Sequence, residues 1–327
     1  MTASDIPVPV ISVAALGTNP DEAAALNQAC RKQGFFYIVD HGIDQTLTAR
    51  LEQLSRVFFE LPLEDKLNIR MELAGHVWRG YFPVGAEQTS GLPDQKEGLY
   101  FGTELPDSHP KVQARVPLHG ANLFPDINGF RETVLTFLDQ MTTLGHTLLR
   151  GIAAGLGLDA HYFEDHCTTD PLVLFRIFHY PPLPSHAAPE TMWSVGEHTD
   201  YGLLTILRQD HTGGLQIKTS DGWIEAPPVD NSFVCNIGDM LERMTGGLFR
   251  STPHRVLNRQ SHGRISFPFF FDPNWDATVT SIPALDTEKI RSAARWDHEN
   301  VFDFRGTYGD YVLRKVSRVF PDLDHSG

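Results

Sequence analysis

Apolar residues recur at helical spacing in three stretches of the chain, which predicts amphipathic helices over 47–61, 129–154 and 308–320. Pro62 stops the first of these helices, because proline cannot continue the ladder of backbone hydrogen bonds. A further helix is expected to begin at Asn19-Pro20-Asp21-Glu22, which combines a capping side chain, a proline and two acids, and to end at Gly34.

Shorter apolar runs predict strands. Residues 8–13, with Pro7 and Pro9, are typical of an edge strand, and residues 35–39 are typical of a buried one. After residue 170 such runs follow one another closely, between turn signals, over 172–178, 203–207, 215–218, 233–237, 255–257 and 265–271. Helices followed by many short strands favour an antiparallel barrel or a jelly roll with a helical layer packed outside.

No internal repeat, low-complexity segment or Gly/Ser linker divides the chain, so the helical and β parts are expected to share one core. Within this one structural unit we distinguish four regions. They are an N-terminal helical and strand region over 1–115, a long support helix over 116–170, a β core over 171–285 and a C-terminal helical extension over 286–327.

Charge and length narrow the possible partners. The chain has 327 residues, with 27 basic and 41 acidic side chains, and its net charge of −14 argues against nucleic acid and anionic membranes, because both are bound through basic patches. No stretch approaches 18 consecutive apolar residues, and the segment MTASDIPVPV lacks the basic-then-apolar pattern of an export signal. We therefore expect no nucleic-acid partner and no membrane segment, and the oligomeric state stays open.

The cysteines also exclude two classes of protein. Cys30, Cys167 and Cys235 lie far apart and form no CxxC pair. This spacing excludes a disulfide framework and a thiolate zinc site, and it fits a reducing compartment, so we expect a cytoplasmic protein.

One short motif carries candidate metal chemistry. His198 and Asp200 precede a predicted strand and are two positions apart, so their side chains point to the same face. His254 follows 56 positions later at the edge of another predicted strand. Two histidines and one carboxylate form the facial triad that binds iron(II) in oxygenases. The spacing alone is weak, because 15 histidines give about one H-x-D by chance in a chain of ordinary composition.

A second pair, Arg264 and Ser266, shares a strand face by the same spacing. A guanidinium grips a carboxylate through two parallel hydrogen bonds, and a neighbouring hydroxyl adds a third. Taken alone, Arg264 is more typical of a salt bridge at the end of a barrel. Tyr180, just before Pro181-Pro182, taken alone is typical of a packed ring with its hydroxyl at the surface.

These motifs together resemble the isopenicillin N synthase-like family of non-haem iron(II), 2-oxoglutarate-dependent oxygenases. The resemblance covers nearly the whole chain in family order, through GFFYIVDHGI (34–43), RGYFP (79–83), RIFHYPP (176–182), GEHTDYGLLTIL (196–207), GGLQI (213–217), NIGDML (236–241), STPHRV (251–256) and RISFPFFF (264–271). It implies a mainly β fold with supporting helices, built on a double-stranded β-helix, which is a distorted jelly roll.

The resemblance also implies roles for the motif residues. By motif position, His198, Asp200 and His254 are the iron ligands, and Arg264, Ser266 and Tyr180 bind 2-oxoglutarate. The chain departs from the plant branch at Phe178, where an asparagine is frequent, so a hydrogen bond from that position to the cosubstrate is not expected. The implied cofactors are Fe(II), 2-oxoglutarate and O2, with ascorbate in support.

The activity implied by this resemblance is oxidation, most simply hydroxylation, of a C–H bond in a small organic molecule, giving succinate and CO2. Two alternatives stay open. One is an iron oxidase of the same family that uses no 2-oxoglutarate, as isopenicillin N synthase does, since that relative uses an R-x-S motif for its substrate's carboxylate. The other is a non-catalytic jelly-roll module that binds a ligand. The substrate-binding residues are not identified.

Some neighbouring residues have two possible interpretations. Phe267, Phe269, Phe270 and Phe271 are candidates for a dry pocket wall or for ordinary core, and Asn236 and Asp239 are candidates to orient a metal ligand.

The polar segment 79–99 is a candidate lid or mouth loop. Within it, Arg79 and Lys96 are candidates to contact an anionic substrate, but they are more typical of solvated side chains or of side chains paired with Glu87, Asp94 or Glu97. The remaining histidines, such as His41, His76, His119, His146, His179 and His262, are expected to be structural or at the surface.

Overall fold

The computed structural model describes residues 7–89, 91–182, 193–285 and 301–319. The strands are β1 (Val10–Ser12), β2 (Phe35–Val39), β3 (Gly80–Phe82), β4 (Glu97–Gly102), β5 (Pro171–Tyr180), β6 (Val195–His198), β7 (Leu204–Gln209), β8 (Leu215–Thr219), β9 (Gly222–Glu225), β10 (Phe233–Ile237), β11 (His254–Val256) and β12 (Arg264–Asn274). The helices are α1 (Pro20–Lys32), α2 (Gln45–Phe59), α3 (Leu63–Lys66), α4 (Pro110–Gln113), α5 (Phe130–Gly155), α6 (Tyr162–His166), α7 (Asp239–Met244) and α8 (Tyr308–Val319). Short 3-10 turns cover Val13–Ala15, Leu67–Ile69 and Met71–Val77.

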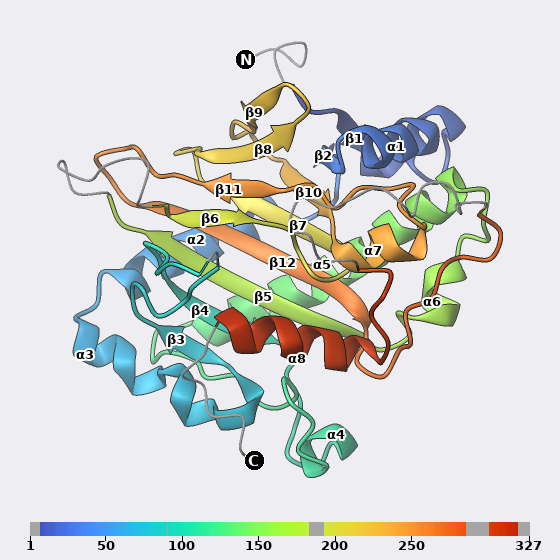
Figure 1. Cartoon of the computed structure of the whole chain (residues 1–327). Helices are drawn as coiled ribbons and strands as arrows, with labels where there is room; N and C mark the ends of the chain where they lie inside the picture. The colour runs from blue at the N-terminus through green and yellow to red at the C-terminus, as the bar shows by residue number, and fades with distance from the viewer. Residues whose placement is uncertain (1–6, 90, 183–192, 286–300, 320–327) are drawn as a thin grey trace.

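The strands form two sheets (Figure 1). The larger has eight strands in the order β1-β2-β10-β7-β12-β5-β4-β3, and the smaller has four in the order β6-β11-β8-β9. Pairing among these strands is antiparallel except between β1 and β2. Of the two arrangements left open by the strand pattern, the described residues show the jelly roll and no closed barrel. This confirms the double-stranded β-helix with supporting helices.

Both edges of the larger sheet come from the N-terminal region. β1 and β2 pair beside β10, and β3 and β4 pair beside β5. β1 is an edge strand, as its prolines predict. The β core therefore shares one sheet with strands contributed by the N-terminal region.

Two helices lie on opposite faces of the larger sheet (Figure 1). The long helix α5 covers one face and buries an apolar stripe that includes Val134, Phe137, Met141 and Leu148. The helix α8 crosses the other face, where Val312 is buried. None of the helices in the described ranges combines the length and apolar character needed to cross a membrane.

The predicted helices over 47–61, 129–154 and 308–320 appear as α2, α5 and α8, and the helix that begins at Asn19 is α1. Gly34 follows α1 with a positive φ of 64°, and a Cβ there would lie 2.0 Å from the backbone oxygen of Arg250. Glycine is therefore required at the turn into β2. Residues 1–6 and Phe320, on which the export and C-terminal helix predictions partly rest, lie outside the described residues.

The phenylalanine run on β12 is split between two faces of the sheet. Phe270 faces the pocket between the sheets, whereas Phe267, Phe269 and Phe271 are buried core residues outside it. Phe271, for instance, packs so closely on α5 that a Cβ at Gly145 would lie 2.5 Å from its ring. The interpretation of the run as a pocket wall is therefore right for Phe270 alone, because neighbouring strand residues point to opposite faces.

The segment 79–99, a candidate lid or mouth loop, is in part regular structure. It begins in β3 and ends in β4, and all the residues of these two strands are buried. The connection between them contributes Glu87, Thr89 and Lys96 to the wall of a pocket. We therefore describe it as a β-hairpin whose loop lines the pocket.

Candidate metal centre and cosubstrate pocket

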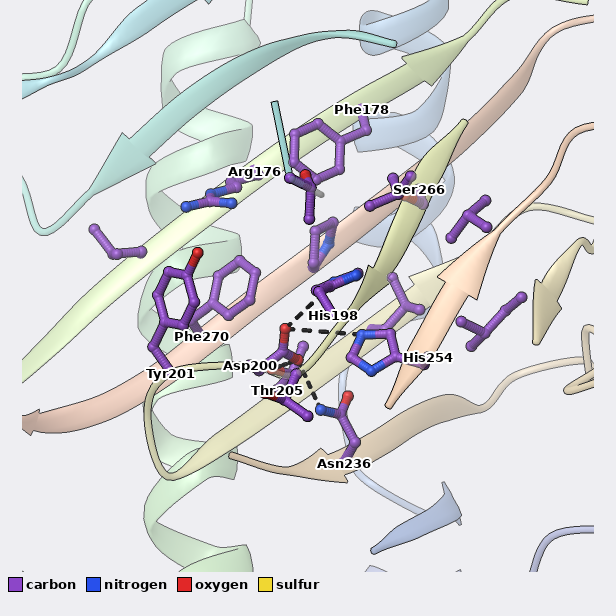
Figure 2. Close-up of a pocket in the computed structure, with 18 of the residues that line it drawn as sticks. Arg176, Phe178, His198, Asp200, Tyr201, Thr205, Asn236, His254, Ser266 and Phe270 are labelled. Carbon is purple, nitrogen blue, oxygen red and sulfur yellow. Dashed lines mark hydrogen bonds and ion pairs between the residues drawn. The ribbon is translucent and has the colours of Figure 1, made fainter. Parts of the chain in front are cut away.

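Pairing between two strands of the smaller sheet brings the two candidate histidines together. His254 of β11 lies directly opposite His198 of β6 in the antiparallel register, and their ring centroids are 4.2 Å apart. Asp200 follows β6 by two positions. One ligand atom from each of the three side chains lies within 4.8 Å of the others, and no other group of three acids, histidines or cysteines in the described ranges does so (Figure 2).

Backbone carbonyls orient both imidazoles. Nδ1 of His198 is 2.8 Å from the carbonyl oxygen of Gly196, and Nδ1 of His254 is 3.2 Å from that of Thr252. If each Nδ1–H donates to its carbonyl, Nε2 carries a free lone pair, and both Nε2 atoms point at Oδ1 of Asp200, at 3.7 and 3.8 Å. Burial, followed by the nearby His254 ring, lowers the pKa of His198 to about 3, so this ring is neutral at physiological pH.

Two donors hold the carboxylate of Asp200 (Figure 2). Its Oδ2 accepts a hydrogen bond from Nδ2 of Asn236, at 2.7 Å, and another from the hydroxyl of Thr205. Burial opposes ionisation of this group, but the two histidines and these two hydrogen bonds outweigh burial and lower the pKa of Asp200. The carboxylate is therefore charged, and its Oδ1 remains for a cation.

Of the two residues predicted to orient a ligand, only Asn236 does so. Asp239 instead accepts a hydrogen bond from the hydroxyl of Tyr311, at 2.8 Å, and links α7 to α8. Thr205 was missed. Its position on β7, opposite Asn236 of β10 in the antiparallel register, brings both donors to the same carboxylate oxygen.

Arg264 lies at the start of β12 and is fully buried. Its Nη2 donates to the side chain of Gln209 at 3.2 Å, but Nε and Nη1 have no hydrogen-bond partner among the described residues. The hydroxyls of Tyr180 and Ser266 lie 3.1 Å apart, and the ring of Tyr180 covers the guanidinium at 4.7 Å. The three side chains predicted to bind one carboxylate are therefore close together, and Arg264 forms no ion pair with an acid of the described ranges.

All six of these predicted residues line one cavity between the two sheets, with a volume of about 1,020 Å³ including its opening. A space of this size fits a small molecule beside the cosubstrate. Phe178, which replaces the asparagine of the plant branch, also lines the cavity. Phenylalanine has no side-chain donor, so no hydrogen bond from this position to a cosubstrate can form.

The wall beyond the metal ligands contains functional candidates that the sequence reasoning did not single out. Arg176 of β5 points into the cavity, with its guanidinium between the rings of Tyr100, at 4.2 Å, and Phe270, at 4.8 Å (Figure 2). Tyr201 lines the same wall, and Val312 and Val316 of α8 complete it. Strand alternation contained a signal for Arg176, since residues 176, 178 and 180 share one face.

A network of buried charges supports Arg176. Its Nη1 lies 3.5 Å from Oε1 of Glu87, and Oε2 of the same carboxylate lies 2.9 Å from Nζ of Lys96. Lys96 also pairs with Asp94. Burial alone would lower the pKa of Lys96, but Glu87 and Asp94 outweigh it and raise the pKa, so the ammonium stays charged. This confirms the expected pairing of Lys96 with Glu87 and Asp94.

Arg79 lies elsewhere. It is buried outside the cavity, donates through Nη2 to the carbonyl oxygen of Leu118 at 2.7 Å, and pairs with no acid in the described ranges. Arg79 therefore lies away from the substrate cavity, is not at the surface, and pairs with no carboxylate of the described residues, so none of the three interpretations is right.

The donor set of the cavity fits both groups that the sequence motifs imply. Two imidazole nitrogens and one carboxylate oxygen converge within 4.8 Å of one another, which suits iron(II) with positions left open. The unpartnered Nε and Nη1 of buried Arg264 suit a carboxylate at the other end of the cavity.

Comparison with known proteins agrees with this geometry. Residues 8–127 match the family model described as non-haem dioxygenase in morphine synthesis N-terminal, and residues 171–273 match that of the 2OG-Fe(II) oxygenase superfamily. A probable iron/ascorbate oxidoreductase of Dictyostelium discoideum is 51% identical, over 98% of this chain and 96% of its own length.

More distant similarities point in the same direction. A homoarginine-6-hydroxylase of Arabidopsis thaliana is 36% identical over 90% of this chain and 88% of its own length. Among solved structures, a full-length protein of Neurospora crassa in complex with alpha-KG superposes with a TM-score of 0.78 and 29% identity, covering 97% of this chain and 98% of that one.

Proposed function

Because this chain belongs to the family of non-haem iron(II), 2-oxoglutarate-dependent oxygenases, we propose that His198, Asp200 and His254 hold its iron and that Arg264, Ser266 and Tyr180 hold its 2-oxoglutarate. The enzyme oxidises a small molecule and uses Fe(II) and 2-oxoglutarate, with ascorbate in support. When bound, the iron and cosubstrate supply the oxidising power, with O2 as oxidant and succinate and CO2 as products.

The observation that carries the assignment is the pair of unsatisfied donor and acceptor sets in one cavity. The Nε2 atoms of both histidines and Oδ1 of Asp200 face each other, and Nε and Nη1 of Arg264 have no partner in the described structure. Buried polar groups are rarely left without partners, so the unpartnered donors of Arg264 fit a bound anion. A cation satisfies the first set and a carboxylate satisfies the second.

The side chains of the chain bind, orient and exclude water. Asn236 and Thr205 fix one oxygen of Asp200, so that the other faces the iron. Arg264 and Ser266, two residues apart on β12, set the position and direction of the cosubstrate carboxylate. The apolar side chains of Phe270, Val312 and Val316 keep water from the opposite wall.

We further propose that the substrate lies against Arg176, Tyr201 and Phe270. These residues line the cavity, Phe270 lies six positions along β12 from Arg264, and Arg176 has its guanidinium stacked between two rings. A cation fixed in this way favours a substrate with a carboxylate or carbonyl oxygen. Replacing Arg176 with methionine should raise KM for the true substrate and leave succinate formation without substrate unchanged.

The metal assignment is tested with a matched pair of variants. Asp200→Ala should abolish iron binding and turnover, because it removes the carboxylate ligand. Asp230→Ala is the control. Oδ1 of Asp230 lies 3.7 Å from Nδ1 of His211, much as Asp200 lies beside a histidine, but the side chains of Asp230 and His211 are 94% and 86% exposed. Iron content by metal analysis and succinate formation should be normal in the control. An Asp200→Ala variant with full activity would refute the assignment.

The cosubstrate assignment has an alternative, an oxidase of the same family that needs no 2-oxoglutarate. Succinate release that follows substrate oxidation one to one, with iron and ascorbate present, supports the 2-oxoglutarate reaction. Substrate oxidation that proceeds equally well without 2-oxoglutarate would instead assign Arg264 and Ser266 to the substrate.

We also propose a cytoplasmic location. Its support is that Cys30, Cys167 and Cys235 are buried free thiols, as a reducing compartment allows. Fractionation of the source cells tests it, and recovery outside the cytoplasm would contradict it.

A further inference from the structure

A second cavity lies outside the iron pocket and shares no lining residue with it. It is bounded by the region between β4 and α5 and by the start of β5, and its volume is about 310 Å³ including its opening. Its polar lining consists of Arg79, Thr103, His109, Lys111, His119 and Asp170. Basic side chains therefore outnumber acidic ones around this space.

Arg79 is the buried charge of this cavity. Its side chain is about 1% exposed, and it packs so closely on β4 that a Cβ at Gly102 would lie 2.0 Å from Nη2. The bond from Nη2 to the carbonyl oxygen of Leu118 is its one hydrogen bond within the described ranges, and Nε has no partner. No carboxylate oxygen of a described residue lies within the 4.0 Å that defines an ion pair with it.

The acid that lines the cavity, Asp170, and the acid whose charge acts on Arg79, Glu104, both have basic partners of their own. Glu104 is bound by Arg131, at 3.0 Å, and by the side chain of Asn122, at 2.7 Å. Asp170 is bound by Lys111 at 2.6 Å. The cavity therefore contains one surplus positive charge, that of Arg79.

The guanidinium of Arg79 stays protonated at neutral pH, although it is buried without a carboxylate partner among the described residues. Burial lowers the pKa of Arg79 to about 9, which still leaves it charged at neutral pH. A buried charge without a partner is strongly unfavourable, so it is normally paired or solvated. Burial also lowers the pKa of His119, so this neighbour adds no charge of its own.

We propose that this second cavity binds a small monovalent anion, a halide or a carboxylate group, against Arg79. The anion takes hydrogen bonds from the guanidinium atoms that Leu118 leaves unused and neutralises the charge. The site is independent of the iron and the cosubstrate, so its occupancy affects the stability of the fold and leaves the catalytic cavity unchanged.

Bromide is the probe for this site, with the full-length, iron-loaded protein. A crystal soaked in sodium bromide should show an anomalous peak beside Nε of Arg79. In solution, saturating bromide should raise Tm by about 3–5 °C. Arg79→Met should lose this shift, whereas Lys111→Met, which removes a charge at the same cavity, should keep most of it. Acetate that displaces the bromide would identify a carboxylate as an alternative ligand.

Several outcomes would overturn the proposal. One is a structure in which water or the Asp170 carboxylate occupies the place beside Arg79 in bromide. Another is an equal Tm shift in the wild type and Arg79→Met. A bromide peak without stabilisation of the wild type marks an adventitious ion only. If Arg79→Met does not fold, the crystal and the wild-type titration still decide. Succinate formation should not depend on bromide, which separates this test from that of the oxygenase function.

Discussion

Replacement of Arg264 by lysine tests the cosubstrate site most directly. The arginine presents two unpartnered N–H groups, at Nε and Nη1, in a pocket where Gln209 already occupies Nη2. A lysine keeps the positive charge but has a single nitrogen, so the carboxylate loses at least one of the hydrogen bonds that the separate guanidinium N–H groups donate. The variant therefore separates the geometry of the fork from its charge.

The size of the effect follows from that count. A hydrogen bond to a charged group contributes about 1.5–3 kcal/mol, and loss of one such bond should raise KM for 2-oxoglutarate about 10- to 150-fold. Ser266→Ala removes one bond from a neutral hydroxyl, for which about 0.5–1.5 kcal/mol and a roughly 2- to 12-fold increase are expected. Iron binding should stay normal in both variants, because the hydrogen-bond partners of these side chains are Gln209 and Tyr180 and not the proposed metal ligands.

The assay is succinate formation at saturating iron and ascorbate, with 2-oxoglutarate varied. Arg208→Lys is the matched control, since Arg208 lies on the neighbouring strand β7 with its guanidinium paired to Glu52 and outside the cavity. Its KM should equal that of the wild type. If Arg264→Lys binds iron and shows an unchanged KM for 2-oxoglutarate, the carboxylate is bound elsewhere and our reasoning fails.

Three further predictions address the metal, the pH dependence and the packing. Asn236→Ala should weaken iron binding about 10- to 100-fold in a metal titration, because Asp200 loses a hydrogen bond that fixes its direction, and unchanged affinity would contradict this. Burial raises the pKa of Asp272 to about 7, so the stability it contributes is full below about pH 4 and is lost as pH rises through 7. The Tm of the wild type minus that of Asp272→Asn should therefore decrease from pH 5 to 8, because only the wild type has a carboxyl group that ionises there. A difference that stays constant with pH would count against this prediction. Gly145→Ala should cost about 1–3 kcal/mol in urea unfolding, because its Cβ would overlap a ring of β12, whereas Gly17→Ala, with no atom within 4 Å, should cost less.

Spacing rules predicted part of the site correctly. His198 and Asp200 share a face because they are two positions apart, and so do Arg264 and Ser266. No local rule connects His254 with His198, since their contact depends on the register of β11 against β6. That connection came from the ordered family motifs, and the structure brings the five residues together in one cavity.

The substrate side of the cavity could not be predicted from the sequence, for a different reason. Its wall combines Arg176 of β5, Tyr201 of a turn, Phe270 of β12 and Val316 of α8, so it is formed by elements that no single periodicity connects. Strand alternation would have placed Arg176 on the face of Tyr180 and divided the phenylalanine run. It would not have shown which face was the pocket.

Two strands at one side of the larger sheet, β3 and β4, were missed because their sequences carry weak signals. β3 is the three-residue segment GYF, and β4, EGLYFG, begins with a charge and contains two glycines. Glycine is depleted in strands because it leaves nothing to pack. Here it is needed, since a Cβ at Gly98 would lie 2.7 Å from the ring of Phe82.

Alternate residues along β12 have two different roles in the structure. Its even positions, from Arg264 to Asp272, line the cavity, while its odd positions, from Ile265 to Phe271, are buried in the core on the other face. A one-residue insertion or deletion would exchange the two sets, moving a guanidinium into the core and an aromatic ring into the cosubstrate site. Evolution or design can therefore change this strand by substitution at either parity, but its length is fixed by two requirements at once. New substrate ranges are more readily reached through α8, whose contribution to the wall carries no such double constraint.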